Sequence, residues 1–171
     1  MERALRYTEE LHQKNPTKNT QLALVARWRN LARALQGANR LQEALEYGKK
    51  AVELDRELYS QDASDVAKGR VVKSFSIYAE TLFADNQTEE AYKMYSEALE
   101  HCKSVCEKND SIPNTRTYVK VLKGLYLCLF KMGQSAEAEE YLLLAKEEAK
   151  KLYERSGAEK DKKLLEELLG E

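Results

Sequence analysis

Thr88–Leu99 reads TEEAYKMYSEAL, and this stretch decides the fold because its two alanines recur at a fixed interval along the chain. The same frame gives LQEALEYGKKAV at Leu41–Val52 and SAEAEEYLLLAK at Ser135–Lys146. A period of this length is typical of stacked helical repeats, in which each unit buries its apolar face only against its neighbours. The positions that recur every 47 residues are Ala44, Ala91 and Ala138, then Ala51, Ala98 and Ala145, and also Leu35, Leu82 and Leu129.

Outward from these stretches, apolar residues recur at helical spacing and turn residues interrupt them, which predicts helical hairpins. We expect one domain over 1–171, with repeats at 19–60, 65–109 and 114–155. Thr88 and Ser135 are the expected N-caps of two second helices. An ordinary three-hairpin bundle without true repeats is the alternative, and the constant interval at three independent positions disfavours it.

The two ends follow the same register. Subtracting one period from Ala51 and Leu58 gives Ala4 and Leu11, so residues 1–14 are predicted to be the second helix of an earlier unit. Adding one period to Leu122 gives Leu169, so residues 158–169 are predicted to be a first helix. We expect these helices either to cap the array or to continue into further repeats.

Composition places the chain among ordinary globular domains, with 43% hydrophobic and 33% charged residues. The 28 basic and 29 acidic side chains nearly balance, so net charge predicts neither a nucleic-acid nor a membrane partner. Three cysteines, an odd number, argue against a disulfide framework and for a reducing compartment. Because no stretch resembles a membrane span or a signal peptide, we expect a soluble cytoplasmic protein.

The repeated positions resemble the tetratricopeptide repeat, whose pattern is Trp-x2-Leu-Gly-x2-Tyr followed by Ala-x3-Phe-x2-Ala. The period of 47 residues is longer than the usual period of about 34, and the terminal proline is absent, as in extended-repeat members. Leu58–Lys68 is similar to the linker of kinesin-light-chain-like repeats. The resemblance implies an all-α, right-handed α-α superhelix whose first helices line a concave groove. The matching residues are Trp28, Leu31, Ala32 and Leu35 with Ala44, Gly48 and Ala51; Phe75, Tyr78, Ala79 and Leu82 with Ala91, Tyr95 and Ala98; and Leu122, Leu125, Tyr126 and Leu129 with Ala138, Leu142 and Ala145.

Charge alternates between the two helices of each predicted hairpin. Glu80 is the one acidic residue in the three first helices, at 19–37, 66–84 and 114–131, whereas the second helices carry more acids than bases. With the arrangement that the resemblance implies, the groove is positive and the outer face negative. Such a groove attracts an acidic segment, and the attraction weakens as salt rises.

The register of the resembled family places Ser76 and eight candidate binding residues in this groove. Arg29 and Arg33 share one helix face, where a bound anion would relieve their mutual repulsion. For any one residue the alternative is a solvated charge on an exposed face. The candidates for contact with an acidic or amphipathic protein segment are Arg29, Arg33, Lys73, Phe83, Lys120, Lys123, Leu127 and Phe130.

Some members of the resembled family clamp a C-terminal carboxylate of a chaperone peptide through Lys, Asn, Asn, Lys and Arg. This chain keeps a base at two of those positions and has Ile77 and Gly124 at two others, which disfavours that mechanism. The matching positions are Arg29, Arg33, Ile77, Lys120 and Gly124.

No catalytic or metal chemistry is indicated. His101, Cys102 and Cys106 share one predicted helix, but a structural zinc site needs four ligands and no second ligand pair follows. The cysteines fit a role as small buried hydrophobes. Phosphate loops, nucleophile elbows and His-Glu-x-x-His motifs are absent from the sequence. We therefore expect no cofactor, no metal and no enzymatic activity.

The function predicted is a protein-interaction module with a basic concave groove. Two alternatives stay open: a scaffold that self-associates through its terminal helices, and the regulatory region of a larger catalytic polypeptide. A consensus design is disfavoured by the unequal repeats and scattered cysteines.

Overall fold

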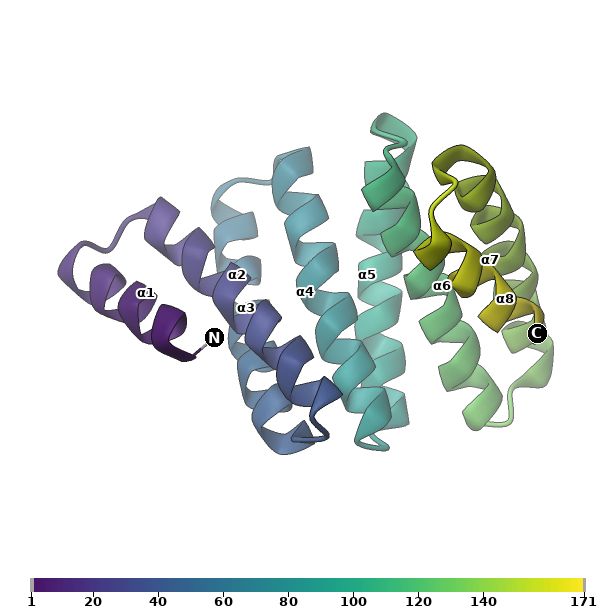
Figure 1. Cartoon of the computed structure of the whole chain (residues 1–171), viewed down its shortest axis with the longest axis horizontal. Coiled ribbons are helices and arrows are strands. Elements are labelled where there is room, and N and C mark those ends of the chain that lie inside the picture. Colours follow the sequence, from purple (N-terminus) through teal and green to yellow (C-terminus); the bar gives the residue numbers. More distant parts are fainter. Residues whose placement is uncertain (1, 171) are drawn as a thin grey trace.

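The computed structural model describes residues 2–170, which form eight α-helices joined by short turns (Figure 1). No strand occurs in this part of the chain, so the predicted all-α helical-repeat fold is confirmed. The helices are α1 (Glu2–Lys14), α2 (Lys18–Gly37), α3 (Leu41–Gln61), α4 (Asp65–Ala84), α5 (Thr88–Lys108), α6 (Ile112–Lys131), α7 (Ser135–Ser156) and α8 (Glu159–Leu169).

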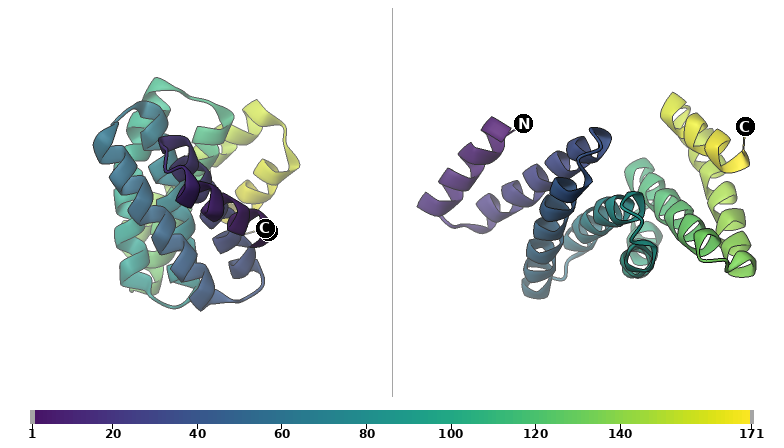
Figure 2. Two further views of the ribbon diagram at one scale, coloured as in Figure 1. Left: turned by 90° about the vertical axis from the view of Figure 1, so that its left-hand side faces the viewer. Right: turned by 90° about the horizontal axis from the view of Figure 1, so that it is seen from below.

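The helices are stacked along an open arc (Figure 2). Helix α2 contacts α4, and α4 contacts α6, so the first helices of successive hairpins form one continuous layer. Both chain ends lie on the same side of the arc when it is seen from below (Figure 2, right). The inner side of the arc, formed by α2, α4, α6 and α8, is called the concave face below.

Three equivalent tight turns set the period of the hairpins. A residue with positive φ stands in each turn, at Asn39 (58°), Asn86 (64°) and Gly133 (78°). These are residues that tolerate the left-handed conformation. The following N–H groups of residues 40, 87 and 134 each donate a 2.9 Å bond to the carbonyl of the periodic leucine, Leu35, Leu82 or Leu129.

The start of the second helices differs from the expected capping. The N-caps of α5 and α7 are Gln87 and Gln134, and neither side chain makes a capping bond. Their carbonyls already accept bonds of 3.0 Å from the N–H groups of Ala91 and Ala138. The helices therefore start one residue earlier than predicted, and Thr88 and Ser135 occupy the first helical position.

The buried hydrophobic residues form one large cluster that extends from α3 to α8 and two smaller clusters among α1, α2 and α3, and small residues let the facing helices approach closely. The six periodic alanines are at most 1% exposed, so the helices approach closely at these points. Gly48 of α3 lies against Tyr78 of α4, and a Cβ added at Gly48 would be 2.8 Å from the Tyr78 ring. One period after Gly48 the second helix carries the large residue instead, since Tyr95 of α5 lies against Gly124 of α6, which stands one period after Ile77.

Two fully buried carboxylates connect neighbouring hairpins. Asp55 of α3 accepts hydrogen bonds from Arg70 Nε (2.7 Å) and Ser74 Oγ (2.5 Å) of α4. Asp161 of α8 accepts two bonds from the Arg116 guanidinium of α6, at 2.5 and 2.7 Å. These bonds hold the pKa of Asp161 below its ordinary value, so they contribute stability at neutral pH that is lost as pH falls through the lowered pKa.

At the two ends, α1 packs on α2 and α8 packs on α7. The division of the chain into three repeats, and the continuation of α1 and α8 into further repeats, stay predictions. None of the helices described here has the combination of length and apolar character needed to cross a bilayer.

A basic pocket on the concave face

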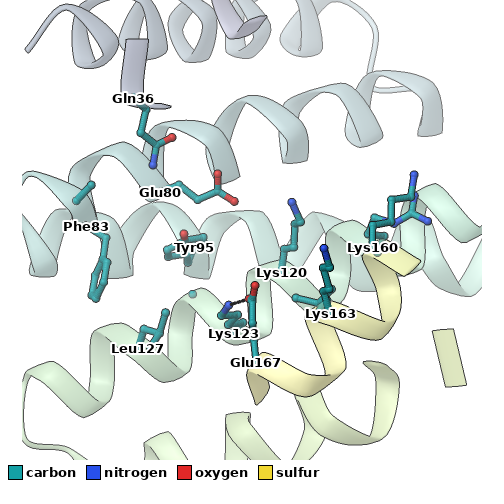
Figure 3. A pocket seen from close by; sticks show the side chains of 14 residues that line it. Gln36, Glu80, Phe83, Tyr95, Lys120, Lys123, Leu127, Lys160, Lys163 and Glu167 are labelled. Atoms are coloured by element: carbon teal, nitrogen blue, oxygen red, sulfur yellow. Dashed lines mark hydrogen bonds and ion pairs between the residues drawn. The ribbon is translucent and has the colours of Figure 1, made fainter. Parts of the chain in front are cut away.

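The concave face carries a pocket of about 450 Å³ formed by α4, α6 and α8, with Gln36 contributed by α2 and Tyr95 by α5. Four of the predicted binding residues line it: Phe83, Lys120, Lys123 and Leu127. Figure 3 shows that Phe83 and Leu127 lie at one end and that Lys120, Lys160 and Lys163 lie at the other. The pocket is therefore amphipathic along its length.

Helix α8 supplies both charge and counter-charge to the pocket. Its Asp161 holds Arg116, and its Glu167 pairs with Lys123. Lys120, Lys160 and Lys163 form no ion pair or hydrogen bond with any residue of the described chain, so their ammonium groups are available to a ligand. A cluster of unpaired lysines at one pocket creates a local positive potential.

The floor between the two ends consists of Glu80 and Tyr95 (Figure 3). Burial raises the pKa of Glu80, while the charges of Lys120, Arg33 and Lys123 act in the opposite direction. Burial also raises the pKa of Tyr95 well above its ordinary value, and the charge of Glu80 adds to that rise. The Tyr95 hydroxyl is therefore neutral at physiological pH and can both donate and accept a hydrogen bond.

Tyr95 reaches this floor from α5, which belongs to the second layer of helices. A Cβ at Gly124 would lie 2.3–2.5 Å from the Tyr95 ring, so the missing side chain of Gly124 leaves the space that the ring fills. The sequence placed Tyr95 in the repeat pattern and Gly124 only at a position of the carboxylate clamp, so it did not predict their contact.

The other predicted binding residues lie outside the pocket. The Arg29 guanidinium is 3.7 Å from Asp55 and donates to the Arg70 carbonyl (3.1 Å), so it belongs to the buried ionic cluster between α2, α3 and α4. Arg33 and Lys73 are exposed, and Phe130 is 62% exposed with its ring tilted against Tyr126. The Ser76 hydroxyl donates to the Val72 carbonyl.

Sequence reasoning missed Lys160 and Lys163. The terminal helix was predicted, and Lys163 stands one period after Arg116. This register could have placed Lys163 on the concave face. The charge comparison could not have found the two lysines, because residues 158–169 hold four acids and three bases.

No protein-family model matches the chain, and no curated protein matches it. The crystal structure of BtubC (BKLC) from P. vanneervenii is similar, with a TM-score of 0.63 at 18% identity, over 91% of this chain and 55% of that one. The chain thus spans about half the length of this neighbour. The DHF79 filament has a TM-score of 0.34 at 13% identity, over 99% of this chain and 94% of that one, which is too low to infer a shared fold. The similarity to BtubC shows a helical repeat fold.

Proposed function

We propose that this chain is a non-catalytic protein-interaction module that binds an acidic or amphipathic segment of a partner protein in the concave pocket. The observation that carries the proposal is the convergence of Lys120, Lys160 and Lys163, unpaired within the described chain, beside the apolar end at Phe83 and Leu127. Amphipathic helices bind grooves of this kind through apolar anchors, and flanking charges set their orientation.

Helix α8 is an example, within the chain itself, of an acidic amphipathic segment bound against α6. It buries Leu164 and Leu168 while Asp161 and Glu167 engage Arg116 and Lys123 of α6. A partner segment with leucines and carboxylates at helical spacing would meet the remaining lysines in the same way. We expect protein or peptide partners rather than nucleic acid or membrane, since acidic and basic residues nearly balance over the whole chain.

The finer family assignment belongs to this proposal. The buried periodic alanines and the close approach of Gly48 to Tyr78 support a tetratricopeptide-type repeat of the extended, kinesin-light-chain-like kind. The free thiols of Cys102, Cys106 and Cys128 fit a cytoplasmic protein. Such a module can also serve as the regulatory region of a larger polypeptide.

The test is binding of a fluorescein-labelled peptide with Glu and Leu at helical spacing, followed by fluorescence anisotropy. Reversing Lys120 and Lys163 together (Lys120→Glu, Lys163→Glu) replaces two attractions by two repulsions and is expected to weaken binding about ten-fold. The matched control reverses Lys93 and Lys103, two exposed lysines of α5, and changes net charge equally. Equal loss in both double variants, or no loss in either, would overturn the pocket as the binding site.

Self-association is the second candidate function. The end helices expose apolar side chains that nothing in the described chain covers: Tyr7 (67%) and Leu11 (42%) of α1 and Leu169 (46%) of α8. Exposed apolar patches on terminal repeats are typical of contacts between copies. Sedimentation at several protein concentrations separates the candidates, because a scaffold predicts a mass that rises with concentration and a simple binding module predicts a constant monomer.

A further inference from the structure

A second groove, of about 740 Å³, lies between α1 and α3 over α2. It shares no residue with the concave pocket. Trp28 and Leu24 of α2 and Leu54 of α3 provide its apolar lining, and three glutamates, Glu9, Glu53 and Glu57, also line it. It is called the Trp28 groove below.

The next repeat shows what fills the equivalent position elsewhere in the chain. Phe75 stands one period after Trp28, and the guanidinium of Arg56 lies 4.9 Å from the centre of its ring. Arg56 is also paired with Glu97 of α5 at 2.5 Å. The ring of Phe75 is therefore already covered by a cation of the same chain, Arg56 of α3, which Glu97 of α5 holds in place.

At the equivalent positions of the Trp28 groove, the acidic and basic residues are exchanged. Glu9 stands one period before Arg56, and Lys50 one period before Glu97. No ion pair or hydrogen bond joins α1 to α3 within residues 2–170, and the Lys50 ammonium lies 5.2 Å from the centre of the Tyr47 ring. Trp28 thus occupies the position equivalent to Phe75, but no lysine or arginine of the described chain lies over its ring.

The charges around the groove favour a cation from outside. Glu9 and Glu57 form no ion pair with any described residue, and Glu53 meets Lys49 at 4.0 Å on the exposed surface. His12, which also lines the groove, is bonded to Thr20 through Nδ1 at 2.8 Å. Lys50 is the one ammonium among the lining residues, against three carboxylates.

We propose that the Trp28 groove binds an arginine side chain from a basic segment of a partner protein. The guanidinium lies against the indole face, as that of Arg56 lies on Phe75, and Glu9 and Glu57 supply the counter-charge that Glu97 supplies to Arg56. Guanidinium groups favour stacking on aromatic faces, and tryptophan is the strongest partner. This site is independent of the concave pocket and takes the opposite charge.

Trp28 is the chain's single tryptophan, so its fluorescence reports on this groove alone. The experiment titrates the whole chain with a short peptide carrying two arginines and, separately, with the same peptide carrying citrulline, the neutral isostere of arginine. The arginine peptide is expected to quench and shift the Trp28 emission saturably, with at least about five-fold tighter binding than the citrulline peptide. Equal binding of both peptides, or no saturable change with either, would overturn the proposal.

Variants separate the groove from general electrostatic attraction. Replacing Glu9 and Glu57 by glutamine is expected to weaken binding of the arginine peptide about five-fold. The same replacement at Glu89 and Glu100, two exposed acids of α5, is expected to leave it within two-fold. Equal weakening by both pairs contradicts a specific site. An emission that shifts with protein concentration in the absence of peptide would also overturn it, since a second copy would then cover the groove.

Discussion

Tyr95 contributes to the concave face from the outer layer of helices because Gly124 has no side chain to stop its ring. The carboxyl group of Glu80 lies beside it, within the electrostatic influence of Lys120, Arg33 and Lys123. At this scale the sequence predicted that the periodic alanines are buried. It also placed on one groove the four residues Phe83, Lys120, Lys123 and Leu127, which line the pocket. It could not predict the Tyr95–Gly124 contact, because that contact depends on which faces two neighbouring helices turn toward each other.

Adding a methyl group at Gly124 tests this contact. Gly124→Ala is expected to lower the free energy of unfolding by about 1–3 kcal/mol, because the new Cβ overlaps the buried Tyr95 ring. Gly37→Ala is the control, since a Cβ there meets nothing within 4 Å, and it is expected to be neutral or stabilising. Urea unfolding measures both, and an unchanged midpoint for Gly124→Ala would contradict the packing described.

Glu80 makes binding of an acidic segment depend on pH. Since burial raises the pKa of Glu80, this carboxyl takes up its proton at higher pH than an ordinary glutamate, and its protonation favours the folded state. As pH falls through the raised pKa of Glu80, the floor of the pocket loses negative charge, and we expect affinity for an acidic peptide to rise. Glu80→Gln is expected to bind more tightly at pH 7.5 and to flatten the pH profile measured by anisotropy. A profile in that variant as steep as in the unaltered chain would exclude Glu80 as its cause.

Among the elements, α8 and α2 depart most from what the repeat pattern suggests. Helix α8 is short, yet it supplies Lys160 and Lys163 to the pocket and is anchored by the buried Asp161. Helix α2 carries Arg29 on the predicted groove face, but Asp55 of α3 draws that guanidinium toward the interior. Periodicity locates helices well, whereas the partner of a long charged side chain depends on buried residues outside the helix that carries it.

Removing the carboxylate of Asp161 tests how α8 is held. Asp161→Ala leaves Arg116 without its buried partner, so we expect a loss of about 3 kcal/mol and faster amide exchange confined to residues 159–169. Asp62→Ala breaks an exposed pair with Lys18 and is expected to cost less than about 1 kcal/mol. Hydrogen exchange read by mass spectrometry locates the change, and exchange that rises equally in α2–α5 would show that α8 is not a separate unit.

Over the three hairpins, charge is sorted by layer, while the total charge of the chain stays near zero. The predicted sorting of bases to first helices agrees with the lysines found at the concave pocket, although α8 also supplies acids there. What the sequence could not provide is the curvature of the arc, which depends on the side chains at every interface between hairpins.

Salt dependence tests this arrangement at the molecular scale. Raising the salt from about 0.05 M to about 0.5 M is expected to slow association with an acidic peptide by about ten-fold and to change dissociation much less. Stopped-flow anisotropy separates the two rates. If salt instead changed mainly the dissociation rate, short-range contacts would determine the salt dependence, and the electrostatic field of the lysines would not be what accelerates association.

The exchange of size between Gly48–Tyr78 and Tyr95–Gly124 makes the hairpins non-interchangeable. If the middle hairpin were deleted in frame, Gly48 would face Leu125, which stands one period after Tyr78, and this smaller side chain would leave a void where the Tyr78 ring now packs. If it were duplicated, Tyr95 of one copy would collide with Ile77 of the next, which stands one period before Gly124. Growth or shortening of such an array through gene recombination therefore requires compensating mutations at the new junction, and the order of the modules is inherited as a unit.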